Sequence, residues 1–250
     1  MKRLAATAAL ALGLLTGPAG AADLTQMTED ERAAFRAEVR AYLLDNPEVI
    51  MEAVNLLEQR QAEAAAQADK QLVAENAEAL FDDGFSWVGG NPEGDLTLVE
   101  FMDYRCGYCR RASAEVDKLL AGDGNIRLVV KEFPILGEAS MTSSRFAIAA
   151  KQVAGDDAYA QVHDALMELE GDPSEVVLRR LAEGLDLDAD AILARMDAPE
   201  VTQEIAATRA LAQRLQITGT PTFVLGDELL RGYLPADQME IIAAHQRAEN

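Results

Sequence analysis

The sequence predicts an α/β fold with a block of helices inserted between its strands and a helical arm in front of it. Three observations predict this architecture. Apolar segments at 96–101 and 126–133 have the pattern of buried strands on either side of a short helical segment. A helical stretch from about residue 139 to 215 separates them from a predicted hairpin at 222–231. Residues 28 to about 81 are polar and rich in Ala, Glu and Gln, which predicts further helices.

The chain of 250 residues has two cysteines, Cys106 and Cys109, three positions apart. At this spacing on a helix both sulfur atoms lie on one side, one turn apart, so a disulfide can close with little backbone movement. The first sulfur stands at the predicted helix N-terminus, which favours the thiolate. The thiolate is the form that attacks a disulfide. A strand, this motif and a helix in succession are typical of a thioredoxin-like redox centre.

Other uses of two cysteines at this spacing need residues that the sequence does not place there. A c-type haem site needs His directly after the second cysteine, where Arg110 stands. A structural zinc site needs four ligands, and the remaining candidates, His163 and His245, have no recognised ligand spacing. An inert disulfide across two residues closes too short a loop to stabilise the fold much. We therefore expect a reversible thiol pair with no metal and no cofactor.

Residues 1–22 have the pattern of a secretory signal peptide. Lys2 and Arg3 precede an apolar run at 4–15, and residues 19–21 form a small-residue cleavage site. The apolar run is too short for a membrane-spanning helix. We expect cleavage near Ala21 or Ala22 and a periplasmic location, where disulfides form and persist.

The formal net charge of −21 disfavours nucleic acid and anionic membranes as partners, because both are negatively charged. Around the cysteines the sign reverses locally, with Arg105, Arg110 and Arg111 close in sequence. Two interpretations are open. The arginines stabilise the thiolate by Coulomb attraction, or they are solvated surface residues.

Residues 23–83 are predicted to form the helical arm. Thr28 and Glu31 fit a capping box at its first helix. Asn46 and Pro47 are predicted as the N-cap and first residue of the second helix. Along that helix, steps of four and three residues resemble a heptad pattern: Ile50, Val54, Leu57, Gln61, Ala64 and Ala68. We expect the arm to form a homo-oligomer; a helix packed on the main domain and a loosely ordered linker are the alternatives.

The main domain is predicted at 84–250, with its helical insertion at about 138–216. Within the insertion, Asp186, Asp188 and Asp190 imitate the opening of a calcium loop. Ala191 stands where that loop requires Gly, so a helix N-cap is predicted instead.

Three separated motifs resemble the DsbA-like branch of the thioredoxin superfamily. They are FMDYRCGYC at 101–109, KEFPILG at 131–137 and GTPTF at 219–223. The resemblance covers about residue 87 to the C-terminus and implies a thioredoxin fold with a helical insertion. In the arm, residues 41–50 resemble the N-terminal segment of ScsC-like proteins, a group tied to copper stress.

The resemblance also implies roles for individual residues. Cys106 would be the exposed nucleophile and Cys109 the buried resolving thiol. Pro221 would be a cis-proline facing them, with Thr220 before it, although an ordinary trans turn is the alternative. Glu100 would be a buried acid that exchanges a proton with Cys109. The alternative for Glu100 is an outward-facing residue on an edge strand.

The implied activity is thiol–disulfide exchange that forms, reduces or isomerises disulfides in secreted proteins, with a membrane protein as redox partner. The dipeptide Gly107-Tyr108 and Thr220 resemble the isomerase branch. The direction depends on a reduction potential that the sequence does not contain. Two alternatives are a periplasmic copper(I) binder that uses the two thiolates, and a chaperone-like module with incidental thiols.

Overall fold

The computed structural model describes residues 26–249, apart from the side chain of Glu249. The predicted signal peptide and its cleavage site lie outside the described residues. The chain divides into two compact units, one up to residue 59 and one from residue 60 onward. Residues 60–83, which the sequence analysis places in the arm, thus belong to the same unit as the sheet.

Two helices make up most of the arm, α1 (Glu29–Asp45) and α2 (Glu48–Glu75). The predicted capping box is confirmed, because the Thr28 N–H donates to Glu31 and the Glu31 N–H donates to the Thr28 hydroxyl. The role predicted for Asn46 is wrong. Its backbone and side-chain nitrogens both donate to the Tyr42 carbonyl, so Asn46 caps the end of α1 instead of the start of α2.

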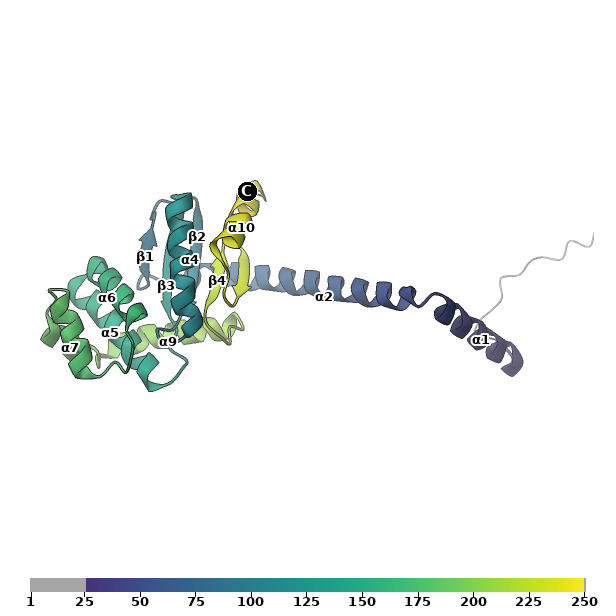
Figure 1. Cartoon of the computed structure of the whole chain (residues 1–250), viewed down its shortest axis with the longest axis horizontal. Helices are drawn as coiled ribbons and strands as arrows, with labels where there is room; N and C mark the ends of the chain where they lie inside the picture. Colours follow the sequence, from purple (N-terminus) through teal and green to yellow (C-terminus); the bar gives the residue numbers. More distant parts are fainter. Residues whose placement is uncertain (1–25, 250) are drawn as a thin grey trace, which may run out of the picture. The chain divides into compact units, whose positions relative to one another are not determined.

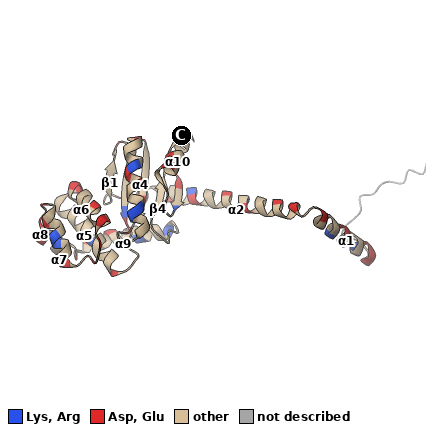
Figure 2. Cartoon of the chain, in the orientation of Figure 1, with Lys and Arg blue, Asp and Glu red and all other residues tan. Residues whose placement is uncertain are grey.

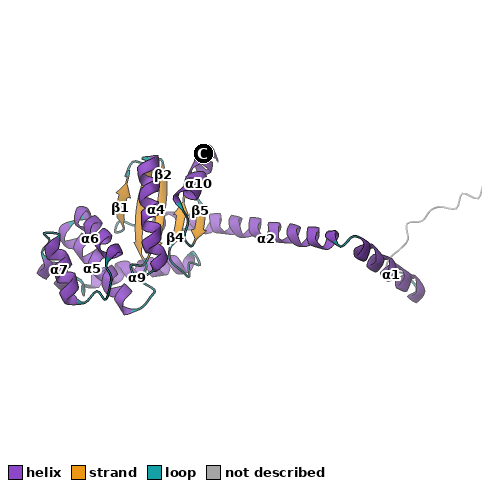
Figure 3. Ribbon diagram, in the orientation of Figure 1, coloured by secondary structure: helices purple, strands orange, loops and turns teal. Residues whose placement is uncertain are grey.

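The described strands form one mixed sheet in the order β1-β3-β2-β4-β5 (Figure 3). Strands β2 and β3 are parallel, and the other neighbours are antiparallel. The predicted strands and hairpin are confirmed, and β1 is added at the edge. The bounds are β1 Trp87–Gly90, β2 Leu96–Met102, β3 Ile126–Glu132, β4 Thr222–Leu225 and β5 Glu228–Arg231.

Helices cover both faces of the sheet. Alternation along β2 directs Leu98 and Met102 into a core shared with α4 (Gly107–Asp123), α10 (Ala236–Glu249) and the inserted helices (Figure 1). Val99 and Phe101 face the opposite core, which contains the end of α2, α3 (Ala77–Phe81) and the end of α9 (Pro199–Arg214). Val73 and Leu80 are buried there. The last part of the predicted arm therefore packs on the sheet.

The helical insertion between β3 and β4 is confirmed. It consists of α5 (Glu138–Ala154), α6 (Asp156–Glu168), α7 (Glu175–Gly184), α8 (Ala189–Arg195) and α9. Asp188 is the N-cap of α8, and its side chain accepts a hydrogen bond from the Ala191 N–H, as predicted. Figure 2 shows acidic residues on the helices of the insertion and basic residues on α4.

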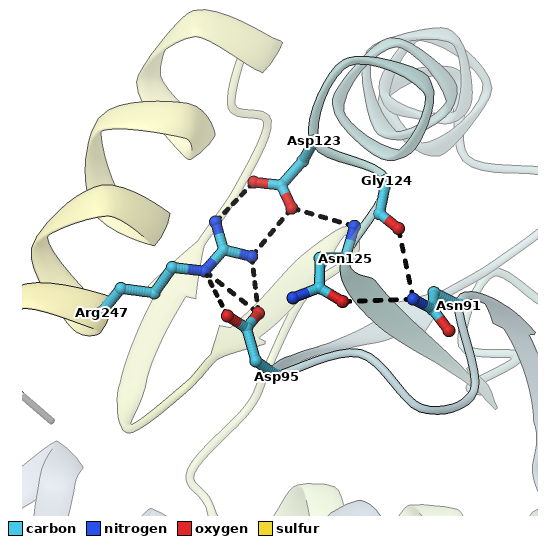
Figure 4. A network of polar contacts seen from close by, with 6 residues as sticks. All are labelled: Asn91, Asp95, Asp123, Gly124, Asn125 and Arg247. Carbon is cyan, nitrogen blue, oxygen red and sulfur yellow. Dashed lines mark hydrogen bonds and ion pairs between the residues drawn. The ribbon is translucent and has the colours of Figure 1, made fainter.

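Arg247 joins the last helix to the rest of the domain (Figure 4). Its guanidinium group donates to Asp95, before β2, and to Asp123, at the end of α4, with distances of 2.6–3.1 Å. Asn91 and Asn125 are hydrogen-bonded beside it. These contacts hold together the end of the sheet at which β2 and β3 begin, remote from the cysteines.

Among residues 26–249, no helix has the length and apolar character needed to cross a membrane.

Candidate active site

The cysteine motif lies at the end of the sheet at which β2 and β3 finish and β4 begins. Strand β2 leads into the loop 103–105, and Cys106 is the N-cap of α4. Because β4 runs antiparallel to β2, the Thr220–Pro221 segment before β4 arrives at this same edge. The Thr220–Pro221 peptide bond is cis. The topology thus brings together two segments that are separated by more than a hundred residues.

Cys106 has a pKa below its ordinary value. Burial raises the pKa of this thiol, but hydrogen bonds from the Thr220 side chain, from Cys109 and from the Tyr108 backbone favour the thiolate and outweigh that effect. When protonated, the Cys106 sulfur donates to the Thr220 carbonyl at 3.3 Å. The prediction that Cys106 is exposed is wrong, because this residue is only 8% exposed and lies beside the Thr220 carbonyl. Cys109 is 0% exposed, so Cys106 is still the more accessible cysteine.

Cys109 differs from Cys106 in both respects. It is fully buried, and it is a free thiol like Cys106. Burial raises the pKa of Cys109 above its ordinary value, and the charges of Cys106 and Glu100 act in the same direction. The pair therefore combines one thiol whose pKa is lowered with one whose pKa is raised.

The flanking arginines mainly hold the polypeptide chain around the motif. Arg105 donates to the Gly171 carbonyl at 2.6 Å. Arg110 donates to the carbonyls of Tyr104 and Leu169 at 2.9 and 2.7 Å. The guanidinium of Arg111 lies 4.2 Å from the centre of the Tyr108 ring. Arg105 and Arg110 are thus neither simply solvated nor the main cause of the lowered Cys106 pKa, which comes from hydrogen bonds.

Glu100 is a buried acid on the central strand, 3% exposed, and the edge-strand alternative is wrong because β2 pairs on both sides. Its Oε1 has no hydrogen-bond partner among the described residues. Burial, together with the charges of Asp117 and Glu132, raises the pKa of Glu100 to about 8. Alternation along β2 directs it to the α4 face, the side on which Cys109 is buried.

A family model described as DSBA-like thioredoxin domain matches residues 97–245, which is more than half of the chain. The chain belongs to this family. A second model, described as copper resistance protein ScsC N-terminal domain, matches residues 31–64 of the arm.

Three solved structures illustrate what this DSBA-like chain is similar to. A thioredoxin-like oxidoreductase from Silicibacter pomeroyi is 44% identical, with a TM-score of 0.64, covering 69% of this chain and 98% of that one. Proteus mirabilis ScsC in a transitional conformation is 26% identical, with a TM-score of 0.65, and the match covers 90% of this chain and 100% of that one. Salmonella enterica Typhimurium BcfH is 26% identical, with a TM-score of 0.70, and the match covers 87% of this chain and 96% of that one.

Among curated proteins, the Na(+)/H(+) antiporter NhaA 3 of Salinispora tropica is 32% identical over 140 residues. That match takes 54% of this chain but 21% of the antiporter, so the chain spans about a fifth of the length of this relative. Disulfide bond formation protein D of Bacillus subtilis is 21% identical over 165 residues, which are 61% of this chain and 73% of that protein.

A buried polar cluster of the DSBA-like domain was not predicted from the sequence. Glu132, at the end of β3, accepts hydrogen bonds from the hydroxyls of Tyr104 and Tyr159, each at 2.7 Å. Burial raises the pKa of Glu132 to about 7, although these hydrogen bonds act against the shift. The neighbouring His163 is partly buried, and desolvation lowers its pKa to about 4. The available signal was a carboxylate close behind the apolar run at 128–130 of β3.

Asp103 is a second missed residue, and it connects the two loops at this edge of the sheet. One carboxylate oxygen accepts from the Arg105 N–H at 2.8 Å. The other accepts from the N–H groups of Ile135 and Leu136 at 2.8 and 3.1 Å. The side chain is fully buried. Asp103 therefore fixes the loop before Cys106 to the loop after β3.

Proposed function

We propose that this chain is a thiol:disulfide oxidoreductase in which Cys106 is the nucleophile and Cys109 the resolving thiol. One observation carries the proposal: two thiols with opposite pKa shifts stand together beside the Thr220 carbonyl. A low pKa supplies the attacking thiolate, and a buried partner with a raised pKa stays protonated until it is needed. Family membership and the similar oxidoreductase structures support this activity.

The reaction follows from this division of roles. The Cys106 thiolate attacks one sulfur of a client disulfide, so a mixed disulfide forms and the other client sulfur leaves as a thiolate that takes up a proton. Cys109 then gives its proton to the Glu100 carboxylate and attacks the Cys106 sulfur, which releases the reduced client and oxidises the motif. With a pKa of about 8, Glu100 is mostly protonated at neutral pH, so this transfer runs through the ionised fraction of the protein, which grows as the pH rises toward 8.

Thr220 would orient the client. It precedes Pro221 just before β4 and is partly exposed, so we propose that its backbone pairs with an extended client segment in the manner of an added strand. Gly107 and Tyr108 complete the surface, since Tyr108 is exposed beside the nucleophile. We place all these residues in the site on the basis of their position at one edge of the sheet.

We infer a lean to isomerisation from Gly107-Tyr108 and Thr220, which resemble the isomerase branch. In isomerisation a client thiol resolves the mixed disulfide and leaves the motif reduced. Refolding of scrambled ribonuclease tests this step. The reduced protein should restore ribonuclease activity faster than a glutathione blank, and the Cys106→Ser variant should not. Recovery equal to the blank would remove isomerisation and leave oxidation or reduction of client proteins.

We further propose export to the periplasm, on the signal pattern of residues 1–22, and a membrane protein as redox partner. We also propose homo-oligomerisation through the arm, because Phe35, Leu44 and Ile50 are exposed there. The similarity to the Salinispora tropica antiporter supports none of these three points, because the match covers only 21% of that protein.

The same arm similarity favours a second candidate, a copper(I) binder, because the matching domain is named for copper resistance. Two thiolates are soft ligands that suit copper(I). Equilibrium dialysis of copper(I) against the reduced protein tests it, with Cys106→Ser as the comparison. Copper binding that is lost in Cys106→Ser would support this candidate. Equal binding by both proteins would show that the thiol pair does not hold the copper.

A further inference from the structure

Tyr104 lies two residues before Cys106 and is 1% exposed. Its hydroxyl donates to Oε1 of Glu132 at 2.7 Å and, with its proton so engaged, accepts from Nδ1 of His163 at 3.1 Å. Its backbone carbonyl accepts from Nε of Arg110 at 2.9 Å. Because Arg110 directly follows Cys109, the contacts of Tyr104 hold the polypeptide chain on both sides of the cysteine motif.

Glu132, which accepts the hydrogen bond of Tyr104, is itself held in place by the surrounding structure. Glu132 lies on β3, which pairs with both β1 and β2, and it is 6% exposed. Tyr159 of α6 donates to the same oxygen of Glu132 at 2.7 Å. The Tyr159 ring also stacks on Trp87, with 5.4 Å between ring centres. Glu132 is therefore fixed by the sheet and by the inserted helix together.

We propose that Tyr104 is a positioning residue whose hydrogen bond to Glu132 sets where the Cys106 sulfur lies relative to Thr220 and the first N–H groups of α4. The groups that favour the Cys106 thiolate belong to Thr220, Cys109 and Tyr108, and each acts over hydrogen-bond distance. A small displacement of the loop 103–105 therefore weakens all of them at once. This inference deepens the proposed function and depends on it for its consequence in catalysis.

The chain offers a matched pair of variants. Tyr104→Phe and Tyr159→Phe each remove one hydroxyl from the same oxygen of Glu132, at the same distance, but only Tyr104 continues into the cysteine loop. The readout is the pKa of the Cys106 thiol, from the pH dependence of its ultraviolet absorbance and its alkylation rate in the full chain. Tyr104→Phe should raise this pKa by about half a unit or more and slow alkylation at neutral pH about threefold. Tyr159→Phe should change neither.

Glu132→Gln removes the negative charge at position 132 but keeps an oxygen that can accept the hydrogen bonds of the two tyrosines. The amide oxygen can still accept from both hydroxyls, so the Cys106 pKa should remain at the wild-type value. A shift in Glu132→Gln as large as in Tyr104→Phe would overturn the proposal in favour of a charge effect, as would equal shifts in the two tyrosine variants. Unfolding midpoints confirm that each variant is folded. A wild-type protein with no exchange activity would contradict the proposed function, while the comparison of thiol pKa values would still decide the role of Tyr104.

Discussion

At the scale of single residues, Glu100 couples the stability of the domain to pH. Its pKa is about 8 in the folded protein, against an ordinary value of about 4.3 in an unfolded chain. Between these values the folded protein holds a proton that the unfolded chain has released, so the free energy of unfolding falls as pH rises. Glu132 acts in the same direction up to about pH 7. His163 acts oppositely below pH ~6.5, because its folded pKa is lowered.

Glu100→Gln should remove the contribution of this carboxyl group. Near pH 5 the variant should match the wild type, and above pH 8 it should be more stable by a few kcal/mol, on the order expected for a shift of this size. Urea unfolding at both pH values measures the difference, and Glu93→Gln serves as an exposed control. A variant that retains the full wild-type dependence on pH would show that Glu100 does not hold the extra proton.

Single residues were predictable where the signal is local. The cysteine pair, its place at the start of a helix, and the Thr220–Pro221 segment follow from short motifs. Glu132 was missed because its two partners, Tyr104 and Tyr159, are 55 positions apart and meet only when the insertion folds against β3. Asn46 was assigned to the wrong helix because an asparagine between two helices can cap either one.

At the scale of elements, a buried ion pair fixes the segment before β1 to the sheet. The Lys131 ammonium lies 2.6 Å from the Asp83 carboxylate and donates to the Ala79 carbonyl at 2.8 Å. The Lys131 side chain is fully buried, and that of Asp83 is 9% exposed. Asp83 also accepts from the N–H groups of Phe85 and Ser86. A buried ion pair therefore anchors the connection between α3 and β1 to the sheet.

Asp83→Ala should destabilise the domain by about 3 kcal/mol, because it leaves the buried ammonium of Lys131 without its counter-charge. Replacing Lys131 by Met in the same chain should recover part of the loss, since no unpaired charge then remains. Urea unfolding measures both effects, with the exposed neighbour Asp82→Ala as the control. Equal losses for Asp83→Ala and Asp82→Ala would refute the role of the ion pair.

At the scale of the whole molecule, the order of the elements was predictable, because hydrophobic periods and turn residues mark each strand and helix. The boundary between the arm and the domain was harder to predict from the sequence. The spacing of apolar and small residues along α2 continues past residue 60, so the sequence does not indicate where the helix begins to pack on the sheet. Val73 and Leu80 reveal it only through their burial.

The arm presents an apolar face whose occupant we propose to be a second copy of the chain. A groove there is lined by Ile50 of α2 and by six residues of α1: Phe35, Arg36, Val39, Arg40, Leu43 and Leu44. Phe35, Leu44 and Ile50 are 48%, 61% and 50% exposed. Covering such surface is favourable by about 25 cal/mol per Å².

The double variant Val39→Glu with Leu43→Glu should therefore lower the native mass to that of a monomer, as measured by light scattering. Ala34→Glu with Ala41→Glu adds the same charge on the other side of α1 and should leave the oligomer intact. A wild-type chain that is already monomeric, or two double variants with the same mass, would contradict assembly through this face.

The central claim is that the Cys106 thiolate exchanges bonds with disulfides of other proteins. Mass spectrometry of Cys109→Ser incubated with a disulfide-containing peptide tests it most directly, because without the resolving thiol the mixed disulfide should accumulate. The account predicts one covalent adduct per chain, attached at Cys106, and none with Cys106→Ser. Absence of an adduct from Cys109→Ser, or an adduct formed equally by Cys106→Ser, would contradict it.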